Sequence, residues 1–230
     1  MPRKIIQLET GEFYHIINRG VEQRDIFLDD DDRLRFINSL LVFNDSNPAP
    51  WESRRFWEQN RHSTVYNHVS KNPLTEIHTF TLMDNHFHLM LRQKIEKGIS
   101  VFMQKIGGYV SYFNKKYQRK GPLFQSRFRP VLIKTEEQLK NTFCYIHTNP
   151  VEIIEPRWKD CIVKDKNEAN NFLRGYRWSS YGSFIGEGEF DNVVKKDFLL
   201  DILGGENGVK EEIDTWIEYK AGQADIENIE

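Results

Sequence analysis

The segment "HFHLML" at residues 86–91 constrains the fold most, because its residues alternate as in a β-strand. Successive side chains of a strand point to opposite faces of a sheet, so His86 and His88 share one face and Phe87, Leu89 and Leu91 share the other. The apolar face predicts a core. Imidazole is the commonest side-chain metal ligand, so the second face indicates half of a metal site. The alternative is an ordinary pair of polar residues on a solvated sheet face.

The residues around this strand predict an α+β domain. We expect strands at 12–18, 76–82, 86–92 and 128–133, and helices at 29–43, from Ser100 to about Gln118, and over 135–149. The order β-α-β-β-α-β-α resembles a ferredoxin-like core, an antiparallel sheet with helices on one face. Residues 44–75 interrupt this order and predict an insertion that contains Trp51 and Trp57.

The charge is unevenly distributed along the chain. The net charge of the whole chain is −2, but residues 201–230 carry nine acidic and two basic side chains, so residues 1–200 have a net charge of +5. We expect residues 187–230 to form an acidic, mainly helical extension that follows a domain at 1–186. The two cysteines form no CxxC pattern, and the chain shows no signal-peptide region and no apolar run of about 20 residues. A cytoplasmic protein with reduced thiols is therefore expected, with no membrane contact.

A basic run, "KKYQRKGPLFQSRFRPVLIK" at residues 115–134, contains seven basic residues and no acidic one. Aromatic residues are interleaved with the bases, as in a groove that binds single-stranded nucleic acid through phosphates and stacked bases. A solvated charged face is the alternative. The candidate DNA-binding residues of this run are Lys115, Lys116, Arg119, Lys120, Arg127 and Arg129.

The helix expected at 135–149 carries a second candidate group. At about 100° per residue, Leu139, Phe143 and Ile146 form its core stripe. Tyr145 and Asn149 are four residues apart and stand together away from that stripe. A tyrosine at the edge of a core stripe and an asparagine near a helix end are the ordinary interpretation.

Five motifs in this order resemble the single-tyrosine HUH transposases, and among them the REP-associated tyrosine transposases. They are "YHIINRG" near the start, "HFH", "GPLFQSRFRP", "YIHTNPV" and "YRWSSYGSFIG" at 176–186. The resemblance covers roughly residues 11–186, apart from 44–75. It implies the HUH endonuclease core, and a DNA strand transferase that acts on single-stranded or hairpin DNA such as REP-like palindromes.

The resemblance also implies a role for individual residues. His86, His88 and Asn149 match the metal-ligand positions, for Mg²⁺ or Mn²⁺, and Tyr145 matches the nucleophile that forms a 5′-phosphotyrosine. Arg19, in the first motif, joins the candidate DNA-binding residues, and no organic cofactor is expected. Insertion-sequence relatives work as dimers, whereas the REP-associated subgroup need not, so a monomer or a homodimer is expected. The resemblance also implies a protein that is associated with the nucleoid.

Two other functions fit the same residues. One is a nucleic-acid-binding module without chemistry, although the aromatic residues that such modules display on the sheet are replaced here by histidines. The other is a metal-dependent phosphodiesterase that uses water and has no need of Tyr145. A covalent protein–DNA adduct distinguishes the strand transferase from both.

Overall fold

The structure is a computed structural model that describes residues 7–49 and 70–227, with the side chains of the last helix described as far as Ala221. The chain divides into two compact units, one of residues 1–78 and 84–134 and the other of 79–83 and 135–230. The domain boundary expected after residue 186 lies inside the second unit. Most of the insertion expected at 44–75, including Trp51 and Trp57, lies outside the described residues.

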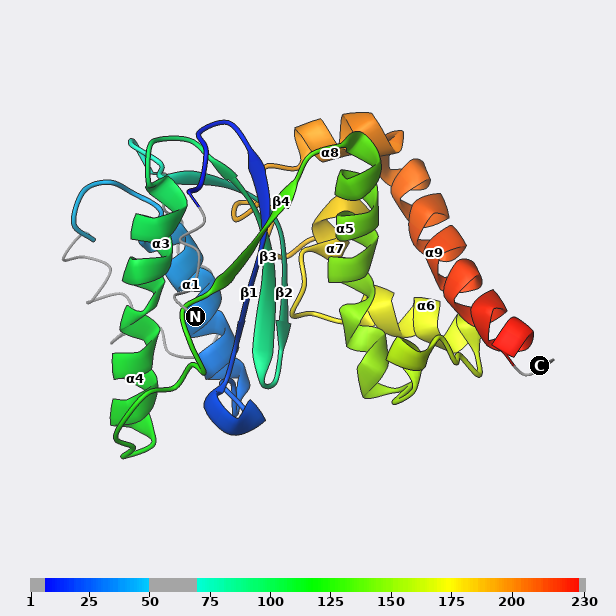
Figure 1. Ribbon diagram of the computed structural model, residues 1–230, viewed down its shortest axis with the longest axis horizontal. Helices are drawn as coiled ribbons and strands as arrows, with labels where there is room; N and C mark the ends of the chain where they lie inside the picture. The colour runs from blue at the N-terminus through cyan, green and yellow to red at the C-terminus, as the bar shows by residue number, and fades with distance from the viewer. Residues whose placement is uncertain (1–6, 50–69, 228–230) are drawn as a thin grey trace. The chain divides into compact units, whose positions relative to one another are not determined.

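A four-stranded sheet has the order β2-β3-β1-β4 (Figure 1). Its strands are β1 (Phe13–Arg19), β2 (Thr75–Met83), β3 (His86–Gln93) and β4 (Arg129–Ile133). β1 is antiparallel to both β3 and β4, and β2 is joined to β3 by a two-residue turn. This strand order and the alternation with helices confirm the expected ferredoxin-like α+β fold.

Three helices of the first unit cover one face of the sheet: α1 (Asp30–Val42), α3 (Gly98–Ile106) and α4 (Gly108–Lys116) (Figure 1). The ring of Phe36 on α1 packs on Phe87 of β3 with 4.7 Å between centroids, and on Tyr109 of α4 with 5.3 Å. Leu89 and Leu91 are also fully buried. The apolar face of β3 therefore packs in a core, as its alternation predicts.

The single helix expected from Ser100 to Gln118 is wrong, because the structure has two helices there. α3 ends at Ile106 and α4 begins at Gly108, with Gly107 as the cap of both. Two consecutive glycines weaken a helix at that point and let it bend. A Cβ on Gly107 would lie 2.9 Å from the carbonyl oxygen of Gln104, so the bend also brings the backbone too close for a side chain.

The second unit is mainly helical and begins with α5 (Glu136–Thr148), whose N-cap Thr135 accepts a hydrogen bond from the backbone N–H of Gln138. After α5 come the short 3₁₀ helices η2 (Asn149–Ile153) and η3 (Trp158–Asp160), and then α6 (Lys166–Gly175), α7 (Tyr181–Phe184), α8 (Asp197–Leu203) and α9 (Gly205–Glu227).

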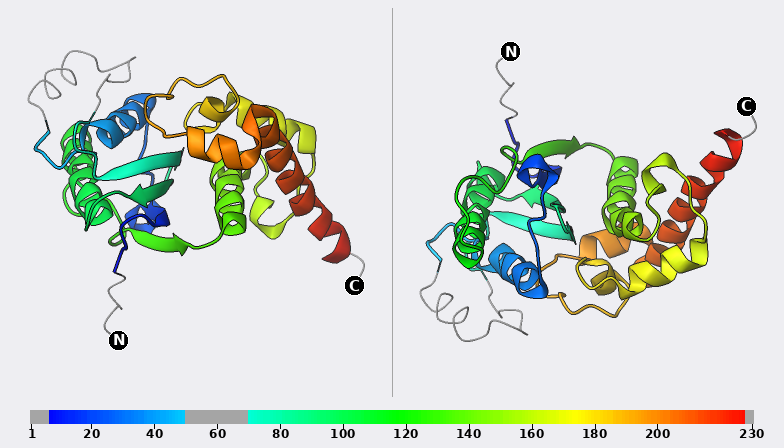
Figure 2. Two further views of the ribbon diagram at one scale, coloured as in Figure 1. Left: turned by 90° about the horizontal axis from the view of Figure 1, so that it is seen from above. Right: turned by 90° about the horizontal axis from the view of Figure 1, so that it is seen from below.

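The acidic end of the chain contains the helices α8 and α9. α9 packs against α5, α6 and α8, and its course past α5 and α6 can be followed in Figure 2. Val209, Ile213 and Ile217 are fully buried at four-residue intervals along α9, so its apolar stripe belongs to the core of the second unit. In the part of the chain that the structure describes, no helix has the length and hydropathy needed to cross a membrane.

Candidate metal centre and nucleophile helix

The two histidines of the "HFH" motif lie on the face of β3 opposite the helices α1, α3 and α4. Both are almost completely buried, with 4% of His86 and 2% of His88 exposed, so the alternative of a solvated sheet face is excluded. Their ring centroids are 4.9 Å apart and the rings are nearly perpendicular. Two imidazoles on one rigid strand can therefore act as a pair.

His86 is held through its Nδ1 atom. This nitrogen lies 2.6 Å from Oδ1 of Asn85, in the turn between β2 and β3. The amide of Asn85 in turn donates through Nδ2 to the carbonyl oxygen of Gln23, at 3.2 Å. Because Oδ1 can only accept, the Nδ1 atom of His86 carries the proton, and Nε2 keeps the lone pair that a metal ion needs.

His88 is held through its Nδ1 atom as well. That nitrogen lies 2.8 Å from Nε2 of His15 on β1, and the two rings are stacked with 5.0 Å between centroids. Burial, and next the charge of Arg129, lower the pKa of His15 to about 4, so His15 is neutral at physiological pH. A neutral His15 has one ring nitrogen free of a proton and can accept a hydrogen bond from His88.

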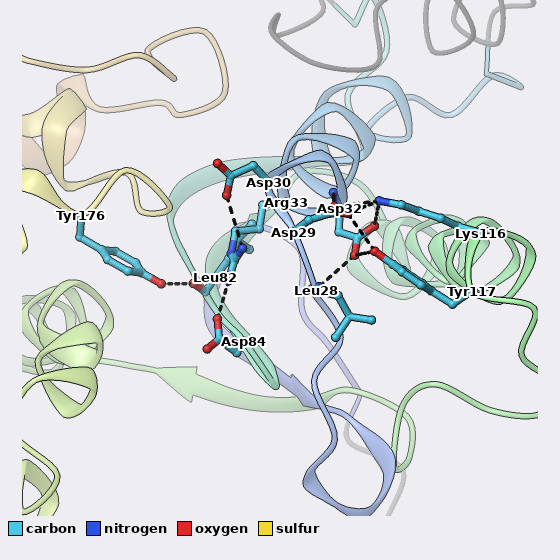
Figure 3. Close-up of polar contacts among 10 residues, drawn as sticks. All are labelled: Leu28, Asp29, Asp30, Asp32, Arg33, Leu82, Asp84, Lys116, Tyr117 and Tyr176. Carbon is cyan, nitrogen blue, oxygen red and sulfur yellow. Dashed lines mark hydrogen bonds and ion pairs between the residues drawn. The ribbon is translucent and has the colours of Figure 1, made fainter.

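The turn that carries Asn85 is fixed from several sides. Asp84 pairs with Arg33 of α1 (Figure 3), and its carbonyl oxygen accepts the backbone N–H groups of Ile26 and Phe27. The N–H of Gly20 donates to the carbonyl oxygen of Asn85 at 2.8 Å. A Cβ on Gly20 would lie 2.1 Å from the carbonyl oxygen of Arg24, too close for any side chain. Glycine is therefore required in the "RG" pair that ends β1.

These residues fit a divalent ion. Each ring is held at Nδ1 by a hydrogen bond, the arrangement that orients metal-binding histidines, so Nε2 is the candidate ligand atom of both His86 and His88. Among the described residues, no group of three or more His, Cys, Asp or Glu side chains is placed to hold a metal. Two imidazoles would leave several coordination positions of such an ion for oxygen ligands.

Tyr145 lies on α5 in the second unit, and 39% of this residue is exposed. Its neighbour Cys144 is buried, and burial, together with the charge of Glu212, raises the pKa of its thiol to about 12. A protonated, buried thiol is a poor nucleophile. Of these two neighbours on α5, Tyr145 is the exposed one and stays the candidate nucleophile.

Asn149 has a different environment from the one expected. The helical periodicity places it beside Tyr145 and away from the core, but only 3% of Asn149 is exposed. α5 ends at Thr148, and Asn149 begins the 3₁₀ helix η2, whose first three residues are all buried. Its role as a metal ligand stays a prediction.

His147 and the motif at 176–186 form a buried contact that the sequence did not reveal. His147 Nε2 lies 2.8 Å from the hydroxyl oxygen of Ser180, and the same hydroxyl accepts the N–H of Phe80 on β2. Burial lowers the pKa of His147 to about 3. Tyr176 also donates its hydroxyl to the carbonyl oxygen of Leu82, at 2.7 Å (Figure 3). The motif therefore fastens this part of β2 within the second unit.

The bases of the run 115–134 divide into a group that is exposed and a group that contacts neighbouring side chains. Lys115, Lys120, Arg127 and Arg129 are exposed, as a phosphate-binding surface requires. Arg119 bonds to Asn114 and lies over the ring of Phe113. Arg19, at the end of β1, is opposite His86 in the register between β1 and β3.

Lys116 differs from the rest of the run. Its ammonium group binds the carboxylates of Asp29 and Asp32 at 2.7 to 2.9 Å, and the hydroxyl of Tyr117 also bonds to both (Figure 3). The charge of Lys116 is thus largely neutralised within the first unit. Its DNA-binding role stays a prediction, and the contacts give it a structural role that sequence spacing did not indicate.

Comparisons with known proteins agree with the motifs. Residues 53–149 match the family model described as "Transposase IS200 like". No curated protein matches the chain.

Solved structures have low similarity to the chain. A REP-associated tyrosine transposase bound to a REP hairpin is 14% identical, with a TM-score of 0.48, over 83% of this chain and 90% of that one. A bacterial tRNA(His) guanylyltransferase-like protein in complex with GTP is 10% identical, with a TM-score of 0.37, over 63% of this chain and 64% of the other. The resemblance to single-tyrosine transposases that the motifs indicate is thus confirmed over residues 53–149, which match the family of IS200-like transposases.

Proposed function

We propose that this protein is a transposase that cleaves and rejoins single-stranded or hairpin DNA through a 5′-phosphotyrosine on Tyr145. In this proposal His86, His88 and Asn149 hold Mg²⁺ or Mn²⁺. The observation that carries it is that both histidines are held in the same way, by a hydrogen bond at Nδ1. They belong to the segment 53–149 that matches the IS200-like transposases.

The reaction needs one nucleophile and no external energy source. The hydroxyl oxygen of Tyr145 attacks phosphorus, the bond from phosphorus to the 3′ oxygen breaks, the phenol loses its proton and the 3′ oxygen gains one. When bound, the divalent ion polarises the phosphodiester and neutralises developing charge. The phosphotyrosine keeps the energy of the broken bond, so a second 3′-hydroxyl group can reverse the step and join two strands.

The substrate class follows from charge as well as from the family. The exposed bases Lys115, Lys120, Arg127 and Arg129 suit the phosphates of a DNA strand. We propose a hairpin with a single-stranded flank, such as a REP-like palindrome, as the substrate. A protein with this activity would work in the cytoplasm, at the nucleoid.

The test uses a hairpin DNA with a single-stranded flank, labelled at its 3′ end, with Mn²⁺ or Mg²⁺. A 5′-phosphotyrosine keeps the 3′ label, so the wild-type protein should carry the label on a denaturing protein gel. Tyr145→Phe removes one oxygen from a partly exposed ring, so binding should persist while the adduct disappears. Tyr219→Phe is the matched control, because Tyr219 is 59% exposed on α9.

The other outcomes identify the alternatives. Cleavage without an adduct would indicate a phosphodiesterase that uses water, and binding without cleavage would indicate a binding module. An adduct that persists in Tyr145→Phe and maps to Tyr109, Tyr112 or Tyr117 would overturn the assignment of Tyr145.

A further inference from the structure

The support of His88 comes from a distant part of the chain, whereas that of His86 is local. His86 is held by its neighbour Asn85, but His88 is held by His15, 73 residues earlier. β1 pairs with β3 so that Ile17 lies opposite His88 and His15 opposite Met90. His15 and His88 are therefore diagonal neighbours on the same face of the sheet, within reach of each other's rings.

The hydrogen bond between the two rings has only one direction that agrees with metal binding. A ligand nitrogen must carry a lone pair, so Nε2 of His88 can bind an ion only if the proton is on its Nδ1. That proton then points at Nε2 of His15, 2.8 Å away, which must accept it. In the opposite direction, His15 would donate to Nδ1 of His88, and Nε2 of His88 would be protonated and unable to bind.

We propose, on the basis of the metal-dependent function above, that His15 is a positioning residue that holds His88 as the Nδ1-protonated tautomer with Nε2 directed at the ion. Asn85 does the same for His86. His15 touches neither the DNA nor the ion in this proposal. The ring of His15 orients His88, and His15 can do so because the "YHIINRG" motif lies on β1, beside β3.

Packing alone is the competing explanation for a buried His15, and it predicts a different mutational pattern. If only volume matters, His15→Leu should be harmless to His88. If the accepting nitrogen matters, His15→Leu should impair His88, and His15→Gln should restore it, because the glutamine side chain places an amide oxygen near the position of Nε2.

The first measurement is made on metal-free, full-length protein and does not depend on activity. Two-bond ¹H–¹⁵N correlation spectra distinguish a protonated ring nitrogen from one with a lone pair. We expect His86 and His88 to be Nδ1-protonated in the wild type. In His15→Leu, His88 should become a mixture of tautomers while His86 stays Nδ1-protonated as an internal control, and His15→Gln should return His88 to the Nδ1-protonated form.

The second measurement is the affinity for Mn²⁺, followed by the EPR signal of the free ion. His15→Leu should weaken binding by about 10- to 100-fold, the usual effect of losing a residue that orients a metal ligand, and His15→Gln should recover most of it. His78→Leu is the matched control, since His78 is another buried histidine of the sheet, on β2. It should change neither the tautomers nor the affinity, and thermal unfolding shows whether each variant is folded.

The outcomes separate this inference from the proposed function. If folded His15→Leu keeps His88 Nδ1-protonated and binds Mn²⁺ as the wild type does, His15 is only a packing residue and the inference is wrong. If the wild-type protein binds no Mn²⁺ and yet cleaves DNA through Tyr145, the metal assignment fails, and the inference fails with it.

Discussion

Lys116 Nζ lies 2.9 Å from Oδ1 of Asp32, and this ion pair joins the last residue of α4 to the first turn of α1. The side chain of Asp32 is fully buried, whereas 26% of that of Lys116 is exposed. Lys116 also binds Asp29, the N-cap of α1 (Figure 3). Lys116, although it belongs to a basic run, thus connects α4 to the start of α1.

We predict that Lys116→Ala lowers the free energy of unfolding by about 2 kcal/mol, less than the loss of a fully buried ion pair because Lys116 is partly exposed. Urea unfolding measures the change. Lys115→Ala is the control, because Lys115 is the exposed neighbour on the same helix. Equal effects of the two substitutions would show that the ion pair contributes nothing to stability.

The cluster of Lys116, Asp29 and Asp32 also makes the folding stability depend on pH. Burial raises the pKa of Asp29. The hydrogen bonds from Lys116, from the N–H of Asp32 and from Tyr117 lower it by more, so the pKa of Asp29 lies below the ordinary value of 3.8. A carboxylate with a lowered pKa stabilises the folded state above its unfolded pKa, and this stabilisation is lost as the pH falls through the folded pKa.

Asp29→Asn should therefore reduce the loss of folding stability that occurs as the pH falls. The variant keeps a side-chain oxygen that can cap α1 but has no charge for Lys116 to bind. Urea midpoints between pH 7 and pH 3 should fall less steeply for Asp29→Asn than for the wild type. Parallel curves for the two proteins would contradict the prediction.

Replacing both His86 and His88 with alanine should abolish cleavage of the hairpin substrate. Affinity for DNA should be mostly retained, because phosphate contacts elsewhere supply it. Cleavage is read on denaturing gels and affinity by fluorescence anisotropy, both in Mn²⁺ or Mg²⁺. A double variant that cleaves at the wild-type rate would show that these histidines hold no catalytic ion.

The exposed bases of the 115–134 run should contact phosphates. The triple variant Lys115→Ala, Lys120→Ala, Arg127→Ala should lower the salt slope of log K by about 2, at ~0.7 for each contact with a single strand. The control replaces three lysines outside the run, Lys97, Lys159 and Lys195. If the affinity and slope of the first variant match those of the control, the run is only a solvated face.

Local signals in the sequence determined most of the elements. The alternation of residues 86–91 placed both histidines on one face of β3, and the acidic residues from Asp29 and the capping pattern at Thr135 indicated the starts of α1 and α5. These features depend on neighbours within a few residues, so periodicity and capping rules are sufficient to find them. The break at Gly107 was missed, although the Gly107–Gly108 pair was a visible signal for it.

Contacts between distant segments were decided only by the tertiary structure. The pairing of His15 with His88 depends on the register of β1 against β3, and the capture of Lys116 by Asp29 and Asp32 depends on how α4 packs beside α1. β1 and β3 are not joined by a tight turn, so the local pattern shows which face of each strand is buried but not which residues lie opposite one another. The packing of α4 beside α1 likewise depends on the fit of the core. The sequence by itself therefore determined which residues are candidates for the chemistry, and the fold decided what holds them in place.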